Sequence, residues 1–331
     1  MLIPKVIRLN LRLDLRLHNR HPSPFARGEA RRDAQHKFVS ETESPAAEGK
    51  ALMRFGFALR SMGAAANSSV LREAAIQADQ AGLDTIWVQD HVAIPPDDIE
   101  GSNGRYLDPL TTLAWLAAAT ERVHIGTAVL VIPYRPPLPT AKAVATVQEL
   151  SEGRLELGIG VGWMDPEFSA LGVDRHARGR ITNETLAFIK EAFEAKDDVV
   201  QLNGQRFVFR PNPIRPRIWI GGGGPHALER TAQLGDGWMP MTDDPEKLAA
   251  PIKTLRARFE DLGRSEPEIA ALGALGRRSE AEDLERLGAL TELGVTEFIQ
   301  GARYDDLDGF QRSFDPLTER IEAYRAQVES S

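Results

Sequence analysis

Residues 218–226 read Ile-Trp-Ile-Gly-Gly-Gly-Gly-Pro-His. The first three are apolar residues that favour a buried strand, and the four glycines that follow suit a turn. Pro225 then suits the first turn of a helix. The stretch therefore predicts a strand that passes through a glycine loop directly into a helix, which is the repeating unit of a parallel α/β sheet.

The glycine loop also suggests chemistry. Residues without a Cβ let backbone amides come close to an anion, and the helix N-terminus adds unpaired N–H groups and a partial positive charge. We interpret Gly222, Gly223 and Gly224 as a cradle for a phosphate group; the alternative is a tight turn needed only for packing. The loop matches neither the Walker pattern nor a full Gly-x-Gly-x-x-Gly at the first strand-to-helix turn.

Eight short apolar runs of this kind follow Met53, and helical patterns separate most of them. The expected strands are 55–59, 85–89, 124–132, 155–161, 218–221, 237–241, 268–272 and 297–300. The expected helices are 68–81, 109–120, 140–151, 181–195, 225–234, 245–262 and 281–293. Eight units in about 250–280 residues fit a closed (β/α)8 barrel, or TIM barrel, better than an open sheet. We therefore assign residues 53–331 to one α/β barrel domain.

The connection after the fourth strand, residues 163–217, is long for such a barrel. Within it, Asn203-Gly204 lies between two short strand-like runs in 201–209, as in a tight hairpin. The sequence thus predicts an insertion after the fourth strand that contains a small hairpin.

Residues 1–52 differ from the rest of the chain. They carry a charge balance of +4; since the whole chain has −8, residues 53–331 carry −12. Residues 7–17 alternate apolar and polar residues like a half-buried strand, and residues 18–50 are polar, without periodicity, and typical of disorder. We expect a basic N-terminal extension, with the domain beginning at Met53; an extra edge strand or a swapped arm is the alternative.

The composition excludes several classes of protein. The chain has no cysteine, which removes disulfides, thiolate metal sites and a cysteine nucleophile. The acidic balance of residues 53–331 disfavours a nucleic-acid partner, and no apolar run is long enough to span a membrane. No histidines and carboxylates stand at a metal-ligand spacing, so we expect no metal.

In a barrel, the chemistry lies at the carboxyl ends of the strands. The second expected strand ends at Asp90 and His91, and an imidazole there can exchange a proton with a substrate near neutral pH. Small residues end the third and fourth strands, at Thr127, Ala128 and Gly160, and make room for a flat ring or simply for packing. Trp163 follows as a wall of a pocket or as part of the core.

Glu167 and Arg178 flank the loop after the fourth strand. Opposite charges at this position form a structural ion pair or contact the acidic tail of a cofactor. We favour the structural ion pair.

Five stretches in order resemble the luciferase-like oxidoreductases, particularly the branch that uses the deazaflavin coenzyme F420. They are 85–91 (Thr-Ile-Trp-Val-Gln-Asp-His), 125–129 (Ile-Gly-Thr-Ala-Val), 153–163 (Gly-Arg-Leu-Glu-Leu-Gly-Ile-Gly-Val-Gly-Trp), 221–225 (Gly-Gly-Gly-Gly-Pro) and 235–238 (Gly-Asp-Gly-Trp). The resemblance covers Met53 to about residue 325.

The resemblance implies a flavin-type ring in the barrel mouth, a cis peptide bond at Ala128–Val129 beneath it, and His91 near the reactive ring and the substrate. The residues expected to bind the cofactor are Asp90, His91, Thr127, Ala128, Val129, Gly160, Trp163, Gly222, Gly223 and Gly224. A sugar-phosphate dehydrogenase of this branch carries a catalytic glutamate where Trp163 stands, which argues against sugar-phosphate oxidation here.

These expectations lead to a function. The first hypothesis is hydride transfer between coenzyme F420 and a small organic substrate, with His91 as the catalytic proton partner. The alternative is a monooxygenase that uses reduced FMN supplied by a separate reductase, and a non-catalytic cofactor-binding protein is a third possibility. The resemblance further implies a homodimer, and we expect a cytoplasmic location.

Overall fold

The structure is a computed structural model that describes residues 52–330. The strand expected at 7–17 and the disorder expected at 18–50 lie outside the described residues. In the part of the chain that is described, no helix combines the length and the apolar character needed to cross a bilayer.

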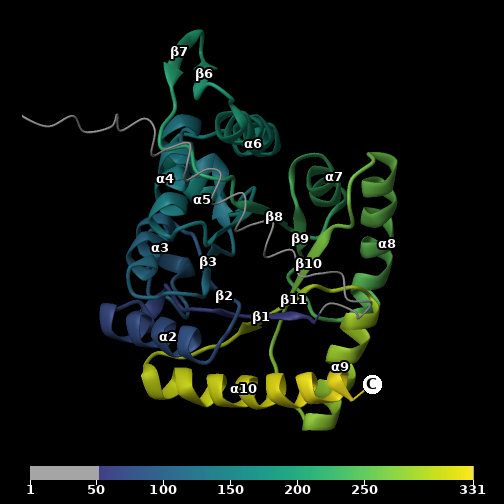
Figure 1. The fold of residues 1–331 in the computed structure, drawn as a ribbon. Coiled ribbons are helices and arrows are strands. Elements are labelled where there is room, and N and C mark those ends of the chain that lie inside the picture. Colours follow the sequence, from purple (N-terminus) through teal and green to yellow (C-terminus); the bar gives the residue numbers. More distant parts are fainter. Residues whose placement is uncertain (1–51, 331) are drawn as a thin grey trace, which may run out of the picture. The chain divides into compact units, whose positions relative to one another are not determined.

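The centre of the structure is a closed barrel of eight parallel strands, as the sequence predicts (Figure 1). Neighbouring strands follow the order β3-β2-β1-β11-β10-β9-β8-β5, and pairing of β3 with β5 closes the ring. The strands are β1 (Arg54–Ala58), β2 (Thr85–Val88), β3 (His124–Thr127), β5 (Leu155–Gly160), β8 (Arg217–Gly221), β9 (Gly237–Met239), β10 (Glu268–Gly273) and β11 (Glu297–Gly301).

The third expected strand differs from its prediction. The sequence suggests one strand over 124–132, whereas the structure breaks it into β3 and the short β4 (Leu130–Val131), with Ala128 and Val129 between them. β4 pairs with β5 beyond this break, Leu130 opposite Ile159. The interruption therefore forms a bulge at the carboxyl end of β3.

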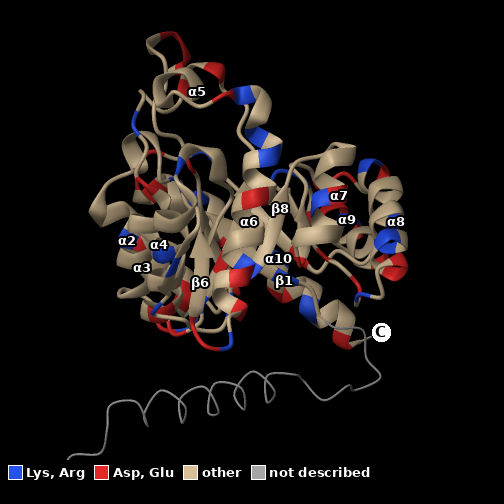
Figure 2. Cartoon of the chain, turned by 90° about the horizontal axis from the view of Figure 1, so that it is seen from above, with Lys and Arg blue, Asp and Glu red and all other residues tan. Residues whose placement is uncertain are grey.

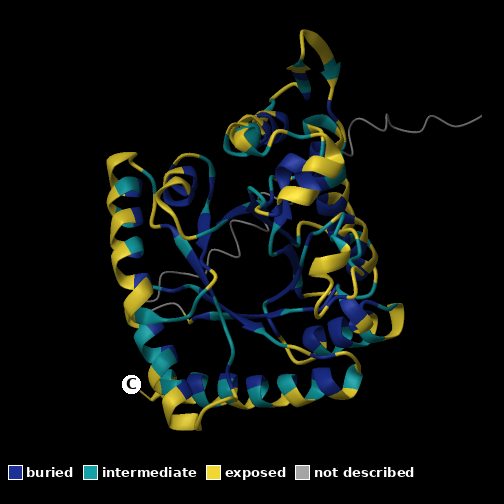
Figure 3. Ribbon diagram, turned by 180° about the vertical axis from the view of Figure 1, so that it is seen from behind, coloured by how far each residue is buried: buried dark blue, intermediate teal, exposed yellow. Residues whose placement is uncertain are grey.

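Helices surround the barrel, with buried strands inside and exposed helix faces outside (Figure 3). They are α2 (Ser68–Gln80), α3 (Pro109–Ala117), α4 (Pro137–Leu150), α5 (Asp165–Leu171), α6 (Arg178–Glu194), α7 (Pro225–Leu234), α8 (Pro245–Asp261), α9 (Glu280–Glu292) and α10 (Leu307–Glu329). Seven of these correspond to the helices expected from the sequence, while α5 and α10 are additional.

The connection from β5 to β8 holds α5, α6 and the predicted hairpin. β6 (Val199–Leu202) and β7 (Gln205–Val208) pair antiparallel, with Leu202 opposite Gln205 across the Asn203-Gly204 turn. Both turn residues have positive φ angles, 50° and 79°. Asparagine and glycine adopt this backbone region most readily, which explains why the pattern predicts the turn.

α10 packs along β1 at the outside of the barrel. Phe57 of β1 contacts Phe310 edge-on with ring centroids 5.1 Å apart, and Phe55 contacts Tyr324 in the same way at 5.5 Å. All four rings are buried, and burying each contributes roughly 2 kcal/mol relative to exposure. This apolar face attaches the last helix to the first strand.

The interior of the barrel contains two buried carboxylates at the amino ends of the strands. Burial alone would raise the pKa of Glu156, but the His124 imidazole and the charges of Arg217 and Arg54 lower it to about 2. Burial raises the pKa of Glu297 to about 7, reinforced by Glu156 and opposed by Arg54. Glu297 accepts hydrogen bonds from Thr85 and Trp87, so it is held rigidly in the barrel.

Candidate functional site

The loops that follow β2, β3, β5 and β8 carry the candidate site, at the carboxyl ends of the strands where barrels place their chemistry. Figure 2 shows the chain from above, with acidic and basic residues interspersed on surrounding helices such as α8. The bulge after β3 lies at this end of the barrel.

The bulge is shaped by Val129, whose peptide bond with Ala128 is cis, as the resemblance implies. A Cβ added at Gly160 would lie 2.4 Å from Cγ2 of Val129, and one added at Gly221 would lie 2.9 Å from its Cγ1. The Val129 side chain thus packs against two neighbouring strands, β5 and β8. Thr127 fixes the start of the bulge, because its hydroxyl donates to the Gly158 carbonyl at 2.7 Å.

Asp90 lies behind the bulge and is 4% exposed. It accepts two hydrogen bonds from the Arg135 guanidinium, at 2.5 and 2.9 Å, and one from the Val131 amide at 2.9 Å. Arg135 also pairs with Asp108, which caps the N-terminus of α3. Asp90 therefore connects the end of β2 to β4 and α3, and its expected contact with a cofactor stays a prediction.

His91 lies at the centre of the site, and its partner is Glu167 of α5. Nδ1 of His91 is 2.9 Å from Oε2 of Glu167. The same carboxylate accepts from the Tyr134 hydroxyl at 2.6 Å and from the amides of Val92 and Ala93 at 2.6 and 2.9 Å. The site therefore contains a hydrogen-bonded His–Glu–Tyr cluster built from three separate segments of the chain.

The expected ion pair between Glu167 and Arg178 is wrong. Arg178 instead donates to the Arg175 carbonyl oxygen at 2.9 Å, within the turn that precedes α6. The interaction of Glu167 with His91 spans 76 positions in the sequence, and it forms because α5 folds back over the end of β2. No local pattern reveals such a contact, although the resemblance already identifies His91.

The charge states of the cluster follow from these bonds. Burial favours the neutral form of Glu167, but the bonds from Tyr134, the two amides and His91 outweigh it and lower the pKa of the carboxyl. Burial and the neighbouring Glu167 charge raise the pKa of the Tyr134 phenol well above its usual range. Glu167 is therefore a carboxylate at neutral pH, and Tyr134 remains a hydrogen-bond donor.

Two aromatic rings lie beside the His91 ring. The Tyr106 ring lies 4.8 Å from the imidazole, and Trp163 meets it edge-on at 6.1 Å. Trp163 is 67% exposed, so it does not belong to the core, and its expected role as the wall of a pocket stays a prediction. In residues 52–330 no cluster of three histidine or acidic residues is arranged to hold a metal ion.

The glycine loop begins at the end of β8. Gly222 has a φ of 112°, which favours glycine, and its carbonyl accepts a hydrogen bond from Trp238 at 2.6 Å. Gly223 and Gly224 are exposed, and a Cβ added at either would meet no heavy atom within 4 Å. Within residues 52–330 neither amide donates to a protein acceptor, so both are free to bind an anion at the start of α7.

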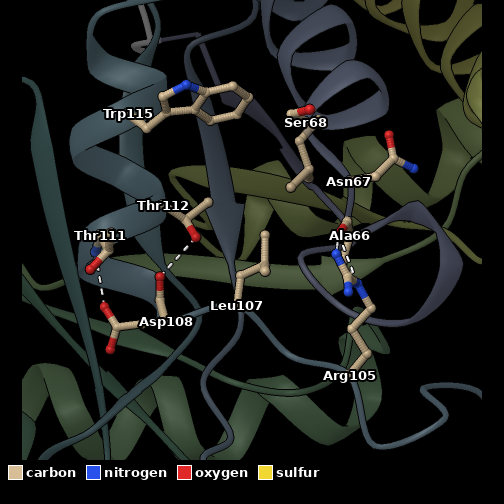
Figure 4. Close-up of a pocket in the computed structure, with 10 residues that line it drawn as sticks. Ala66, Asn67, Ser68, Arg105, Leu107, Asp108, Thr111, Thr112 and Trp115 are labelled. Atoms are coloured by element: carbon tan, nitrogen blue, oxygen red, sulfur yellow. Dashed lines mark hydrogen bonds between the residues drawn. The ribbon is translucent and has the colours of Figure 1, made fainter.

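A separate groove of about 550 Å³ lies between α2 and α3 (Figure 4). It shares no lining residue with the cluster around His91. Asn67 and Asp108 cap the two helices there, and Arg105 donates to the Ala66 carbonyl at 2.7 Å. These polar groups are bonded internally, so the groove presents mainly the apolar surface beside Trp115.

The sequence and the fold of this chain resemble those of known proteins. Residues 53–329 match the family model for luciferase-like monooxygenases. The F420-dependent glucose-6-phosphate dehydrogenase of Amycolatopsis mediterranei is 34% identical over 184 residues, which are 51% of this chain and 52% of that protein.

Two solved structures have the same fold. An F420-dependent secondary alcohol dehydrogenase in complex with an F420-acetone adduct has a TM-score of 0.67 at 17% identity, covering 83% of this chain and 99% of the other. The monooxygenase RslO1 from Streptomyces bottropensis has a TM-score of 0.66 at 20% identity, covering 82% of this chain and 100% of the other.

Proposed function

This chain belongs to the luciferase-like monooxygenase family, and from that premise we propose that it transfers hydride between coenzyme F420 and a small organic substrate. The observation that carries the proposal is the position of His91 at the barrel mouth, 2.9 Å from a buried carboxylate. The arrangement suits a residue that exchanges a proton with a substrate while the cofactor handles the hydride. The F420-dependent dehydrogenase among its relatives supports the choice of cofactor.

The residues of the mouth fit such a cofactor. The free amides of Gly223 and Gly224 at the N-terminus of α7 would bind its phosphate. The bulge at Ala128–Val129 would support the flat ring of the cofactor. Val129 packs against Gly221 at the start of the glycine loop, so the proposed ring and phosphate positions lie next to each other. When bound, a deazaflavin supplies hydride chemistry, because it has a carbon where a flavin has N5.

The protein's own residues would control the substrate. His91 would hold or release the proton on the substrate oxygen. Trp163, which contacts the His91 ring edge-on, would cover this side of the bound cofactor ring and exclude water from it. Trp163 also stands where the resemblance places a catalytic glutamate in the sugar-phosphate enzymes. We therefore propose a substrate other than a sugar phosphate.

The second candidate is a monooxygenase that uses reduced FMN from a separate reductase, and the shared fold of RslO1 favours it. Oxygen separates the two activities. We expect turnover of F420 with small alcohols or carbonyl compounds to continue in the complete absence of oxygen. Turnover that requires both oxygen and reduced FMN would favour the monooxygenase.

We further propose that the protein is a cytoplasmic homodimer, as the resemblance implies. Light scattering of the purified full chain tests the dimer, because it measures mass independently of shape. A mass equal to that of one chain across micromolar concentrations would exclude it.

A further inference from the structure

We propose that Glu167 is the positioning residue of this site: it fixes the His91 ring with a proton on Nδ1 and leaves Nε2 as the atom that exchanges a proton with the substrate. The inference rests on the proposed function for the substrate, but its first step concerns only side chains of this chain.

The donors around Glu167 fix the direction of its bond with His91. The amides of Val92 and Ala93 can only donate, and both bond to Oε1. Tyr134 keeps its proton, because burial and the Glu167 charge raise its pKa, and it donates to Oε2. The carboxylate is ionised and can only accept. The proton between Glu167 and His91 must therefore belong to Nδ1 of His91.

The other ring nitrogen then has a defined role. In a neutral imidazole, protonation of Nδ1 leaves a lone pair on Nε2. In the described part of the chain Nε2 forms no hydrogen bond, and the His91 side chain is 18% exposed. Nε2 is consequently the nitrogen available to a molecule in the barrel mouth.

Packing holds the carboxylate in place. Phe168, the next residue on α5, is buried against the Tyr134 ring at 5.3 Å and forms a small cluster with Val131. The side chain of Glu167 itself is fully buried. The two amides that donate hydrogen bonds to Glu167 belong to Val92 and Ala93, the residues directly after His91. The same carboxylate therefore fixes both the loop after β2 and the His91 ring.

The step that this arrangement supports is a single proton transfer. The O–H bond of a substrate hydroxyl breaks, an N–H bond forms at Nε2, and the imidazole gains one positive charge. That charge lies beside the Glu167 carboxylate, so the site holds an ion pair instead of an isolated buried cation. In the opposite direction, Nε2–H returns the proton to a substrate alkoxide, which becomes a hydroxyl. In the reduction of a carbonyl compound, the bound cofactor would supply the hydride to the carbonyl carbon, and Nε2–H would supply only the proton to the oxygen.

The direct test measures the tautomer of His91 by NMR in the uniformly 15N-labelled full chain, without cofactor or substrate. A His91→Asn variant identifies the signals of this ring. We expect the neutral ring to show a protonated Nδ1 and an unprotonated Nε2. A ring protonated mainly on Nε2, or an even mixture of the two tautomers, would overturn the proposal.

Two variants separate positioning from general stability. Glu167→Gln removes the ionised acceptor, and we expect it to reduce the fraction protonated at Nδ1 severalfold. Tyr134→Phe removes another donor from the same carboxylate, and we expect the tautomer to stay as in the wild type. If Glu167→Gln does not fold, the wild-type tautomer and Tyr134→Phe still decide the question. A folded Glu167→Gln protein with an unchanged tautomer would contradict a positioning role.

The kinetic readout comes second. With F420 and a substrate that the wild type converts, Glu167→Gln should lower kcat by roughly 10²-fold or more while KM changes little. This is the pattern expected when a residue that orients a base is lost. Failure of the two proposals is distinguishable. A protein with protonated Nδ1 but no F420 binding would refute the proposed cofactor alone, whereas F420 turnover with protonated Nε2 would refute the role of Glu167 alone.

Discussion

The Val129 side chain occupies the space that Gly160 leaves by having no Cβ. The distance from a Cβ at position 160 to Cγ2 of Val129 would be 2.4 Å, too short for two carbon atoms. The bulge after β3 therefore depends on a glycine in the neighbouring strand. A methyl group at position 160 would move Val129 and, with it, the surface proposed to support the cofactor ring.

Gly160→Ala should accordingly lower the free energy of unfolding by about 2 kcal/mol and weaken cofactor binding, because overpacking displaces Val129. Urea unfolding and a binding titration measure the two effects. Gly288→Ala is the matched control: position 288 lies in α9 with no heavy atom within 4 Å of an added Cβ, so alanine should raise stability by about 0.5–1 kcal/mol. Equal stability of the Gly160→Ala protein and the wild type would show that Val129 adapts freely.

Gly223→Asp should abolish cofactor affinity without changing the unfolding midpoint. The position is exposed and has room for a side chain, so the fold tolerates the substitution, but a carboxylate would repel the phosphate. Gly223→Ala is the control, and it should bind much more tightly than Gly223→Asp because it adds no charge. Unchanged affinity in Gly223→Asp would remove the glycine loop from the proposed site.

Glu297→Gln should flatten the pH dependence of stability. The pKa of Glu297 in the folded protein is about 7, above its ordinary value of 4.5, so the folded state holds this proton more tightly. The resulting stabilisation is complete below about pH 4.5 and is lost as the pH rises through about 7. The loss is on the order of 3 kcal/mol, since each pKa unit corresponds to about 1.4 kcal/mol.

Urea unfolding of wild type and Glu297→Gln at several values between pH 5 and pH 8 measures this difference. We expect the wild type to lose stability relative to the variant across this range. Parallel curves for the two proteins would mean that Glu297 is ionised throughout.

His91→Asn should leave cofactor binding within a few fold of the wild type and lower turnover by roughly 10²- to 10⁴-fold, because it removes the proton partner and little of the binding surface. The binding titration and steady-state kinetics together check this. Full activity of the variant would assign the proton transfer to another group. If no activity is found in either protein while the cofactor still binds, the non-catalytic alternative gains support.

The fold was largely predictable from sequence because its strands are continuous apolar runs. In a parallel barrel both faces of a strand are buried, so runs such as Ile218-Trp219-Ile220 stand out from the helical stripes between them. The break at Ala128–Val129 does not appear in such a pattern, because its residues are as apolar as the strand around them. The sequence analysis did not predict α10. Its apolar residues have helical spacing, but Gly309 and Pro316 are poor helix formers and lie within the helix.

The site was predictable in part. A histidine at a strand end marks the position of His91, and four glycines mark the loop before α7. The partner of His91 was not predictable from local patterns, because the contact with Glu167 depends on how α5 folds over the mouth. Asp90 shows the same limit, since its bonds to Arg135 join segments 45 positions apart.

Binding of a deazaflavin in the barrel mouth underlies the proposed function. Titration of the purified full chain with coenzyme F420 and, separately, with reduced FMN tests it most directly. We expect saturable micromolar binding of F420 that Gly223→Asp abolishes. Micromolar binding of reduced FMN with no binding of F420 would contradict it.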